Sequence, residues 1–182
     1  LRYLAHGTEL SVKPMRGLGE PSLTQFQGTY YLTLRNDEQG YVTSGPDGLT
    51  FDPVQPWRFD DGEPLGNYNT QQHWVTHRDG LFLVYTRRGA NNDHIMRHRA
   101  PLFIAQVDPS ALHVIRASER VLIPEVGATY GNFGVVNVSP AETWVTDAEG
   151  MYASKEAVAR GANARVYAAR ILWARPNLLN VP

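Results

Sequence analysis

Short runs of apolar and β-branched residues recur along the whole chain, and polar turn residues separate them. Runs rich in Val, Ile, Thr, Tyr, Phe and Trp between Gly, Pro, Asn and Asp clusters predict β-strands. The predicted strands are residues 29–35, 41–44, 72–77, 81–87, 102–107, 112–116, 133–138, 143–146 and 165–174. Only residues 154–161 predict a helical turn, with Ser154 as N-cap and Gly161 just past its end. The pattern indicates an all-β meander.

An internal repeat organises these strands. In two copies a polar residue stands eight positions before a turn glycine, and an arginine stands seven positions after it. The copies are Glu20–Gly28–Arg35 and Gln72–Gly80–Arg87, and a looser third copy begins at Asn132. Repeats of this length with several strands each are typical of propeller blades. We therefore expect blade units at roughly residues 20–70, 71–125 and 130–175.

Closed propellers usually have four to eight blades. The sequence therefore predicts a partial β-propeller of about three blades, forming the C-terminal part of a larger one. All 182 residues are expected to belong to this one domain.

The composition narrows the possible functions without choosing one. The formal net charge is −1, which gives no overall attraction to nucleic acid, and no apolar run is long enough for a membrane span. The absence of cysteine removes disulfides, thiolate metal sites and a cysteine nucleophile. His94 and His98 have a spacing that could hold a metal on a helix, but no third ligand accompanies them, so neither a metal nor a cofactor is expected.

The turn at residues 44–51 resembles the Asp box of sialidase propellers. Ser44, Gly48 and Thr50 match the motif, Phe51 replaces its tryptophan, and the aspartate is shifted by one position to Asp47. Residues 107–112 occupy the same place in the second unit, in a more degenerate form. In such a turn the Asp side chain binds local backbone and Gly takes a positive φ.

The blocks at residues 68–74 (YNTQQHW) and 87–94 (RRGANNDH) resemble predicted bacterial exo-α-sialidase-like proteins. The resemblance implies that Glu20 activates a tyrosine nucleophile, for which Tyr130 is the candidate. It also implies that Arg35 and Arg99 bind a sugar carboxylate, and it favours a secreted or periplasmic location. The first triad arginine and the aspartate acid/base of that family have no match here.

Further site candidates follow from the repeat and from one long loop. Inner strands line the central channel of a propeller, so Glu20, Gln72 and Asn132 are expected to point to a common hollow, with His73 beside them. Long loops on rigid scaffolds often bind ligands. The polar loop 87–99 adds, for binding an anionic glycan or for proton transfer, the candidates Arg87, Arg88, Asn92, Asp93 and His94.

Three functions fit these residues. The first is a sialidase-like glycoside hydrolase acting on a sialic or uronic acid glycan. The second is a polysaccharide lyase, in which His73, His94 or a tyrosine removes the proton next to a carboxylate neutralised by arginine. The third is a glycan-binding module without catalysis.

Overall fold

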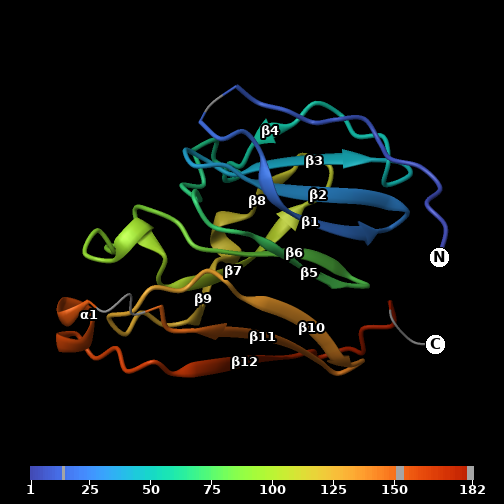
Figure 1. Ribbon diagram of the computed structural model, residues 1–182. Coiled ribbons are helices and arrows are strands. Elements are labelled where there is room, and N and C mark those ends of the chain that lie inside the picture. Colours follow the sequence, from blue (N-terminus) through green and yellow to red (C-terminus); the bar gives the residue numbers. More distant parts are fainter. Residues whose placement is uncertain (14, 151–153, 180–182) are drawn as a thin grey trace.

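The computed structural model of the protein describes residues 1–13, 15–150 and 154–179, which contain three antiparallel sheets (Figure 1). The first sheet has the order β1 (Gly19–Phe26), β2 (Thr29–Arg35), β3 (Tyr41–Gly45) and β4 (Gln55–Pro56). The second has the order β5 (His73–His77), β6 (Gly80–Tyr85), β7 (Leu102–Asp108) and β8 (His113–Val114), and β9 (Arg120–Ile123) also pairs with β7. The third has the order β10 (Gly134–Ser139), β11 (Glu142–Ala148) and β12 (Val166–Leu172).

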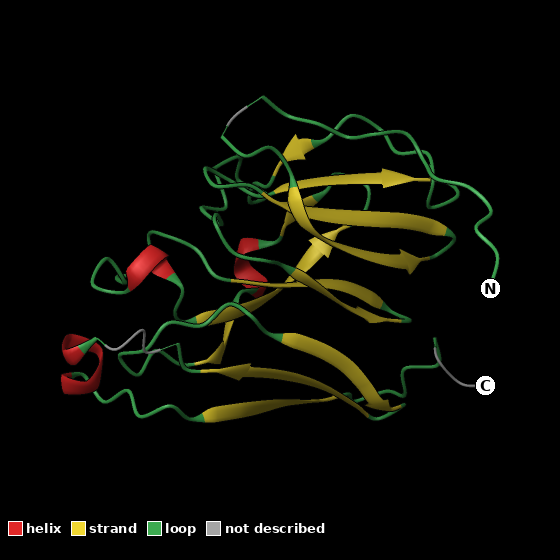
Figure 2. Cartoon of the chain, viewed as in Figure 1, coloured by secondary structure: helices red, strands yellow, loops and turns green. Residues whose placement is uncertain are grey.

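Helical structure is confined to three short pieces of the described residues (Figure 2). They are η1 (Met96–His98), η2 (Arg116–Ser118) and α1 (Lys155–Ala159). The predicted helical turn is confirmed by α1, because the Ser154 side chain accepts a hydrogen bond from the Ala157 N–H and Gly161 follows with φ +114°. An N-cap serine and a positive-φ glycine satisfy the free backbone groups at the two ends of a helix.

The predicted strands agree with the structure in their order and differ at their ends. Strand β1 was expected only as the start of a repeat, and β4 and β9 were not predicted, because short edge strands carry a weak hydrophobic pattern. The hairpin between β1 and β2 turns at Gln27 and Gly28, with φ of 50° and 85°. Two positive φ values in succession give the type I′ turn that suits the twist of paired strands.

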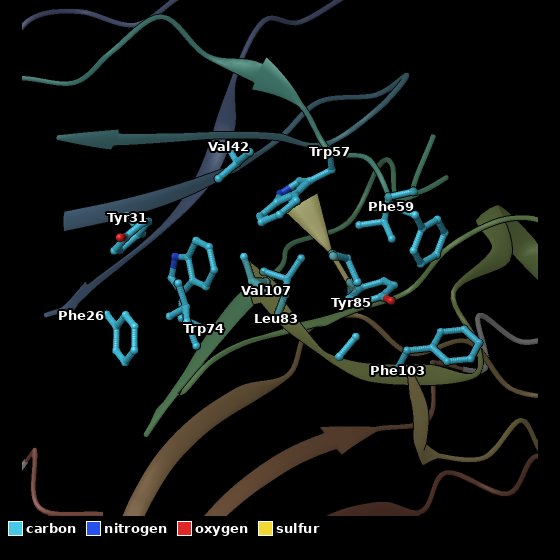
Figure 3. Packing of buried hydrophobic residues seen from close by; sticks show 14 residues of the cluster. Phe26, Tyr31, Val42, Trp57, Phe59, Trp74, Leu83, Tyr85, Phe103 and Val107 are labelled. Carbon is cyan, nitrogen blue, oxygen red and sulfur yellow. The ribbon is translucent and has the colours of Figure 1, made fainter. Parts of the chain in front are cut away.

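The first and second sheets pack face to face through a cluster of aromatic side chains (Figure 3). The Trp57 and Trp74 rings lie 5.8 Å apart, and Tyr31 packs edge-on to Trp74. Both indole N–H groups have acceptors, the Thr33 hydroxyl for Trp57 and the Ser22 carbonyl for Trp74. The buried tryptophans therefore fix how the two sheets lie against each other.

The second sheet is buried on both faces. Along β6, Leu83 and Tyr85 face the first sheet, whereas Val84 packs with Val75 and Val145 toward the third sheet. Alternation along a strand sends neighbouring side chains to opposite faces. This arrangement explains why β6 reads as a nearly continuous apolar run rather than as an alternating one.

The first strands of the sheets lie together, as inner strands of propeller blades do. Strand β5 contacts both β1 and β10, and the Thr24 and Thr76 hydroxyls are 2.6 Å apart between β1 and β5. A groove of about 400 Å³ is lined by residues of all three strands, among them Ser22, Thr76 and Asn137. The described residues form an all-β fold arranged as part of a β-propeller, as the sequence predicted.

Two aspartate turns occupy the same place in the first and second sheets. Between β3 and β4, the Asp47 carboxylate accepts the N–H groups of Leu49 and Thr50 at 2.9 and 2.7 Å. Between β7 and β8, Asp108 accepts the N–H groups of Ser110 and Ala111 at 2.8 and 3.2 Å. Each carboxylate replaces backbone acceptors that the turn lacks, which is the role expected from the sequence.

Candidate functional site

Glu20 lies at a backbone irregularity at the start of β1. Its φ is +45°, and the register between β1 and β2 shifts between Gly19 and Ser22. Bulges often redirect a side chain, and a strained non-glycine residue is a feature of functional sites. The Glu20 side chain is 42% exposed, so the irregularity presents a carboxylate to solvent at the start of an inner strand.

Arg35 holds this carboxylate from the neighbouring strand. Its Nη1 donates to Glu20 at 3.0 Å, and its Nη2 donates to the Asp37 carboxylate at 3.1 Å and to the Asn69 side-chain oxygen. The Arg35 side chain is only 14% exposed. The guanidinium is therefore fixed by three partners. Of the two carboxylates that it contacts, Glu20 is more exposed than Asp37.

Asp37 is surrounded by arginines. Hydrogen bonding from Arg16 is the main cause that lowers the pKa of Asp37, and the charges of Arg35 and Arg97 act in the same direction. A pocket of about 190 Å³ opens here, lined by Arg16, Arg35 and Asp37 together with the 17–19 segment that precedes Glu20. The pocket therefore joins the Asp37 carboxylate to two arginine side chains, Arg16 and Arg35.

Asn69 connects Arg35 to a second, more buried arginine. Its side chain accepts from Arg35, and its backbone carbonyl accepts from Nη2 of Arg99 at 2.5 Å. Asn69 has a φ of +52°, and Arg99 is 7% exposed. Arg35 and Arg99, the two arginines implied by the family resemblance, thus both donate to Asn69, although Arg99 lies beneath the surface.

Asp147 provides negative charge beneath the same region. Burial raises the pKa of Asp147, while the backbone N–H groups of Gly131 and Ala148 and the charge of Arg99 oppose this shift. The Gly131 N–H donates to it at 3.0 Å, and the Gly131 carbonyl accepts from Thr70. These contacts attach the segment before β10 to the loop that precedes β5.

His73 and Asn132 lie at the starts of the other two inner strands. The His73 Nδ1 is 3.2 Å from the Ser22 hydroxyl, and its ring packs edge-on to Phe133 at 5.1 Å. Burial lowers the pKa of His73, and the negative charge of Glu20 partly offsets this shift. Asn132 is exposed next to Phe133. His73 is therefore a half-buried imidazole close enough to Glu20 to feel its charge.

Gln72 does not point to the hollow expected from the repeat. It is fully buried, accepts from the Thr33 hydroxyl at 3.1 Å and donates to the Thr70 carbonyl at 2.6 Å. Gln72 precedes β5, which begins at His73, and its amide is held in the interior by Thr33 and Thr70. The prediction for Gln72 is wrong, and His73 takes its place beside Glu20.

Tyr130 is poorly suited to the nucleophile role predicted for it. The side chain is 3% exposed, its hydroxyl donates to the Pro124 carbonyl at 2.9 Å, and its ring packs edge-on to Tyr167. Burial raises the pKa of Tyr130, so the phenol is held in its neutral form. Tyr130 packs between the second and third sheets, because the 127–133 segment carries apolar residues into that core.

Two candidates of the 87–99 loop are occupied by structural contacts. Arg87 makes a two-pronged ion pair with Glu119 at 2.7 and 2.8 Å and lies over the Phe103 ring. Asn92 is 1% exposed and donates to the carbonyls of Arg87, His98 and Ala100. These two side chains build the loop, so they are not available to a glycan.

The other candidates of this loop remain at the surface. His94 is 46% exposed and lies 3.4 Å from Glu125. Arg88 stacks over the Tyr68 ring at 4.0 Å and donates to the Glu38 carbonyl. Asp93 is 94% exposed, with His98 Nε2 at 3.1 Å. The loop extends from the side on which β1, β5 and β10 begin (Figure 1).

Sequence reasoning missed two polar side chains at this face, Tyr68 and His98. The Tyr68 hydroxyl is 2.6 Å from His98 Nδ1. The residues come from separate loops, and no spacing in the sequence links them. From the sequence, His98 is a candidate only as a possible metal partner of His94. In the described residues, no group of three or more His, Cys, Asp or Glu side chains is placed to hold a metal ion.

Within the same described ranges, no helix is long and apolar enough to cross a membrane.

Comparisons with known proteins identify the fold of this chain but assign it to no family. No family model and no curated protein matches this chain. Among solved structures, it is similar to the xylan β-1,4-xylosidase from Bacillus halodurans C-125, with a TM-score of 0.58 and 12% identity over 96% of this chain and 33% of that one. It is also similar to the endo-arabinase from Bacteroides thetaiotaomicron VPI-5482, with a TM-score of 0.58 and 13% identity over 92% of this chain and 54% of that one.

A third similar structure is the GH43B protein of the Bacteroides ovatus xyloglucan locus, with a TM-score of 0.52 and 13% identity over 91% of this chain and 29% of that one. The chain thus spans about half or less of the length of these three proteins. It shares the β-propeller fold of glycoside hydrolases and corresponds to part of it.

Proposed function

We propose that the protein acts on glycans as part of a glycoside hydrolase, with Glu20 as a proton-transferring carboxylate. The observation that carries this proposal is the Glu20–Arg35 pair at the start of an inner strand, beside a pocket. Glycoside hydrolysis generally requires a positioned carboxyl group that exchanges a proton with the glycosidic oxygen or with water. Solved structures with this fold include a xylosidase and an endo-arabinase, which supports a glycan as the ligand.

The arrangement around Glu20 suits proton transfer. Its side chain is partly open to solvent, so a substrate oxygen can reach it, and the bound Arg35 fixes its orientation. Arg35 is itself held by Asp37 and Asn69, so the Glu20 carboxylate keeps its orientation during the reaction. A carboxyl group positioned in this way typically contributes a rate factor of about 10²–10⁴.

We further propose an anionic glycan, carrying sialic or uronic acid, as the substrate. Support comes from the cationic side chains Arg16, Arg35 and Arg97, whose charges all act on Asp37 next to the pocket. Guanidinium groups bind carboxylates through parallel hydrogen bonds. The Asp47 turn, which resembles the Asp box, supports the narrower sialidase-like hypothesis.

The test compares two glutamate variants of the full chain on chromogenic glycosides. The panel contains a sialoside, a β-glucuronide, a β-xyloside and an α-arabinofuranoside. Glu20→Gln keeps the side-chain shape and is expected to lower kcat on the hydrolysed substrate by about 100-fold or more. Glu63→Gln is the matched control, because Glu63 is exposed in the separate 58–64 loop.

Different results separate the candidate functions. Hydrolysis of the sialoside or glucuronide supports the anionic substrate, and hydrolysis confined to the neutral glycosides rejects it. A Glu20→Gln variant as active as Glu63→Gln rejects the role of Glu20. Glycan binding without turnover by the wild-type protein identifies the non-catalytic module instead.

A further inference from the structure

Tyr68, His98 and Asp93 form a hydrogen-bonded chain that the proposed hydrolysis does not use. The Tyr68 hydroxyl is 2.6 Å from His98 Nδ1, and His98 Nε2 is 3.1 Å from the Asp93 carboxylate. The Tyr68 and His98 rings are tilted by 55° with centroids 5.7 Å apart. Both nitrogens of the imidazole are therefore engaged, one on each side.

The direction of these hydrogen bonds follows from the partners. An ionised carboxylate only accepts, so His98 donates from Nε2 to Asp93. In the neutral imidazole the other nitrogen is then an acceptor, and Tyr68 donates its hydroxyl proton to Nδ1. A hydroxyl bound to a base that a third group orients is the arrangement by which proteins activate weakly acidic side chains.

The backbone on both sides of this chain is strained. Arg97 and His98 have φ values of +58° and +53°, and Asn69, next to Tyr68, has +52°. Non-glycine residues adopt this region rarely, and they persist there where surrounding contacts over-determine them. Here the buried Asn92 side chain supplies such a contact by donating to the His98 carbonyl. The position of His98 is thus enforced rather than incidental.

The chain of three residues lies beside the Glu20 site. Asn69 follows Tyr68 directly and accepts from both Arg35 and Arg99. The Arg88 guanidinium stacks on the Tyr68 ring with its carbon 4.0 Å from the ring centre. A cation over a phenol ring stabilises the negative charge that develops when the hydroxyl loses its proton. Tyr68 is half-buried and Arg88 is exposed, so a ligand can approach both.

We propose that Tyr68 is the catalytic base of a second reaction at this face, β-elimination on a uronic acid glycan. His98 takes the Tyr68 proton and leaves a phenolate. The phenolate removes the C5 proton of the uronate, whose carboxylate is neutralised by Arg88. The C5–H electron pair forms the C4=C5 double bond, and the C4–O bond to the neighbouring sugar breaks. Tyr68 then returns the proton to the leaving oxygen, so no co-reactant is consumed.

This reaction shares with the proposed function only the anionic glycan as ligand. It uses Tyr68 and His98 where hydrolysis uses Glu20, and its products differ. Elimination leaves an unsaturated uronate that absorbs in the ultraviolet, whereas hydrolysis adds water and leaves a saturated sugar. The two activities are therefore measured separately in the same sample.

The experiment incubates the full chain with polygalacturonate, alginate and hyaluronan and follows ultraviolet absorbance, with mass spectrometry of the products. Tyr68→Phe keeps the ring under Arg88 and removes only the hydroxyl, and Tyr30→Phe on β2 is the matched control. We expect unsaturated product from the wild type and from Tyr30→Phe. For Tyr68→Phe we expect kcat to fall by about 100-fold or more at unchanged KM.

His98 is a positioning and proton-accepting residue, and it has its own readout. His98→Gln is expected to lower kcat with little change in KM, whereas Arg88→Gln is expected to raise KM. If His98→Gln lowers the thermal stability but does not lower kcat selectively over KM, His98 has a structural role and the assignment is overturned.

The two proposals fail in different ways. Absence of unsaturated product from all three polymers, or a Tyr68→Phe variant as active as Tyr30→Phe, overturns the elimination and leaves the hydrolase proposal intact.

Discussion

The guanidinium of Arg35 donates to the Glu20 carboxylate at 3.0 Å across the β1–β2 pair. The two residues are the first and last of one repeat unit in the sequence, and the hairpin returns the end of that unit to its beginning. In this copy, Arg35, seven positions after the turn glycine Gly28, meets Glu20, eight positions before it. The β1–β2 hairpin therefore places the two ends of this repeat unit close enough to form an ion pair at the start of an inner strand.

The first prediction concerns Arg35 itself. Arg35→Gln removes the charge that faces Glu20 and Asp37 and is expected to destabilise the protein by about 1–3 kcal/mol, since partly buried partners lose their donor. Urea unfolding measures this change. Arg78→Gln, at an exposed arginine beside Asp79, is the control and is expected to stay within about 0.5 kcal/mol of wild type. Equal stabilities of the two variants would contradict the importance of the Glu20–Arg35 pair.

The second prediction separates a core tyrosine from a nucleophile. Tyr130→Phe removes the hydrogen bond to the Pro124 carbonyl and is expected to cost about 1 kcal/mol of stability while leaving turnover within about 2-fold of wild type. Urea unfolding and steady-state kinetics on the same sample check both parts. A large loss of kcat with unchanged stability would restore Tyr130 as the nucleophile.

Much of the fold was predictable from the sequence because it depends on local patterns. The apolar run of β6 reflects its burial on both faces, and the turn residues mark where the hairpins close. The helical turn at α1 was predictable from its cap residues alone. The missed strands β4 and β9 owe their pairing to β3 and β7, so their own residues carry little signal.

The candidate site was predictable only in part. Glu20, Arg35 and His73 share a repeat position or its neighbour, and the structure brings them to one end of the inner strands. Gln72 shows the limit of this reasoning, because its buried contacts with Thr33 and Thr70 cannot be read from the repeat. The contact between Tyr68 and His98 depends on how two loops fold over each other, which no local pattern encodes.

The third prediction concerns the loop that carries His98. Asn92→Ala removes three donated hydrogen bonds from a buried side chain and is expected to destabilise the loop by about 1–3 kcal/mol. Hydrogen exchange is then expected to accelerate at the amides of residues 88–99, with little change in β1. Asn163→Ala, at an exposed asparagine, is the control. Uniform acceleration over the whole chain would show that Asn92 supports the global fold instead of this loop.

The last prediction follows from the lowered pKa of His73. Burial disfavours the charged imidazole, so the folded protein takes up this proton only at a pH below the unfolded value of about 6.5. Between the two pKa values the unfolded chain binds more protons, and stability therefore falls as the pH is lowered through this window. Above about pH 6.5 both states are neutral at His73, and this contribution to the pH dependence vanishes.

Urea unfolding at several pH values between about 5 and 7.5 checks this expectation by comparing the wild type with His73→Gln. The variant cannot titrate at this position, so its free energy of unfolding is expected to fall less steeply on acidification. His6→Gln, at an exposed histidine of the N-terminal segment, is the matched control and is expected to keep the wild-type slope. Identical slopes for wild type and His73→Gln would mean that the charge of Glu20 fully compensates the burial of His73, so that the imidazole has the same pKa in the folded and the unfolded chain.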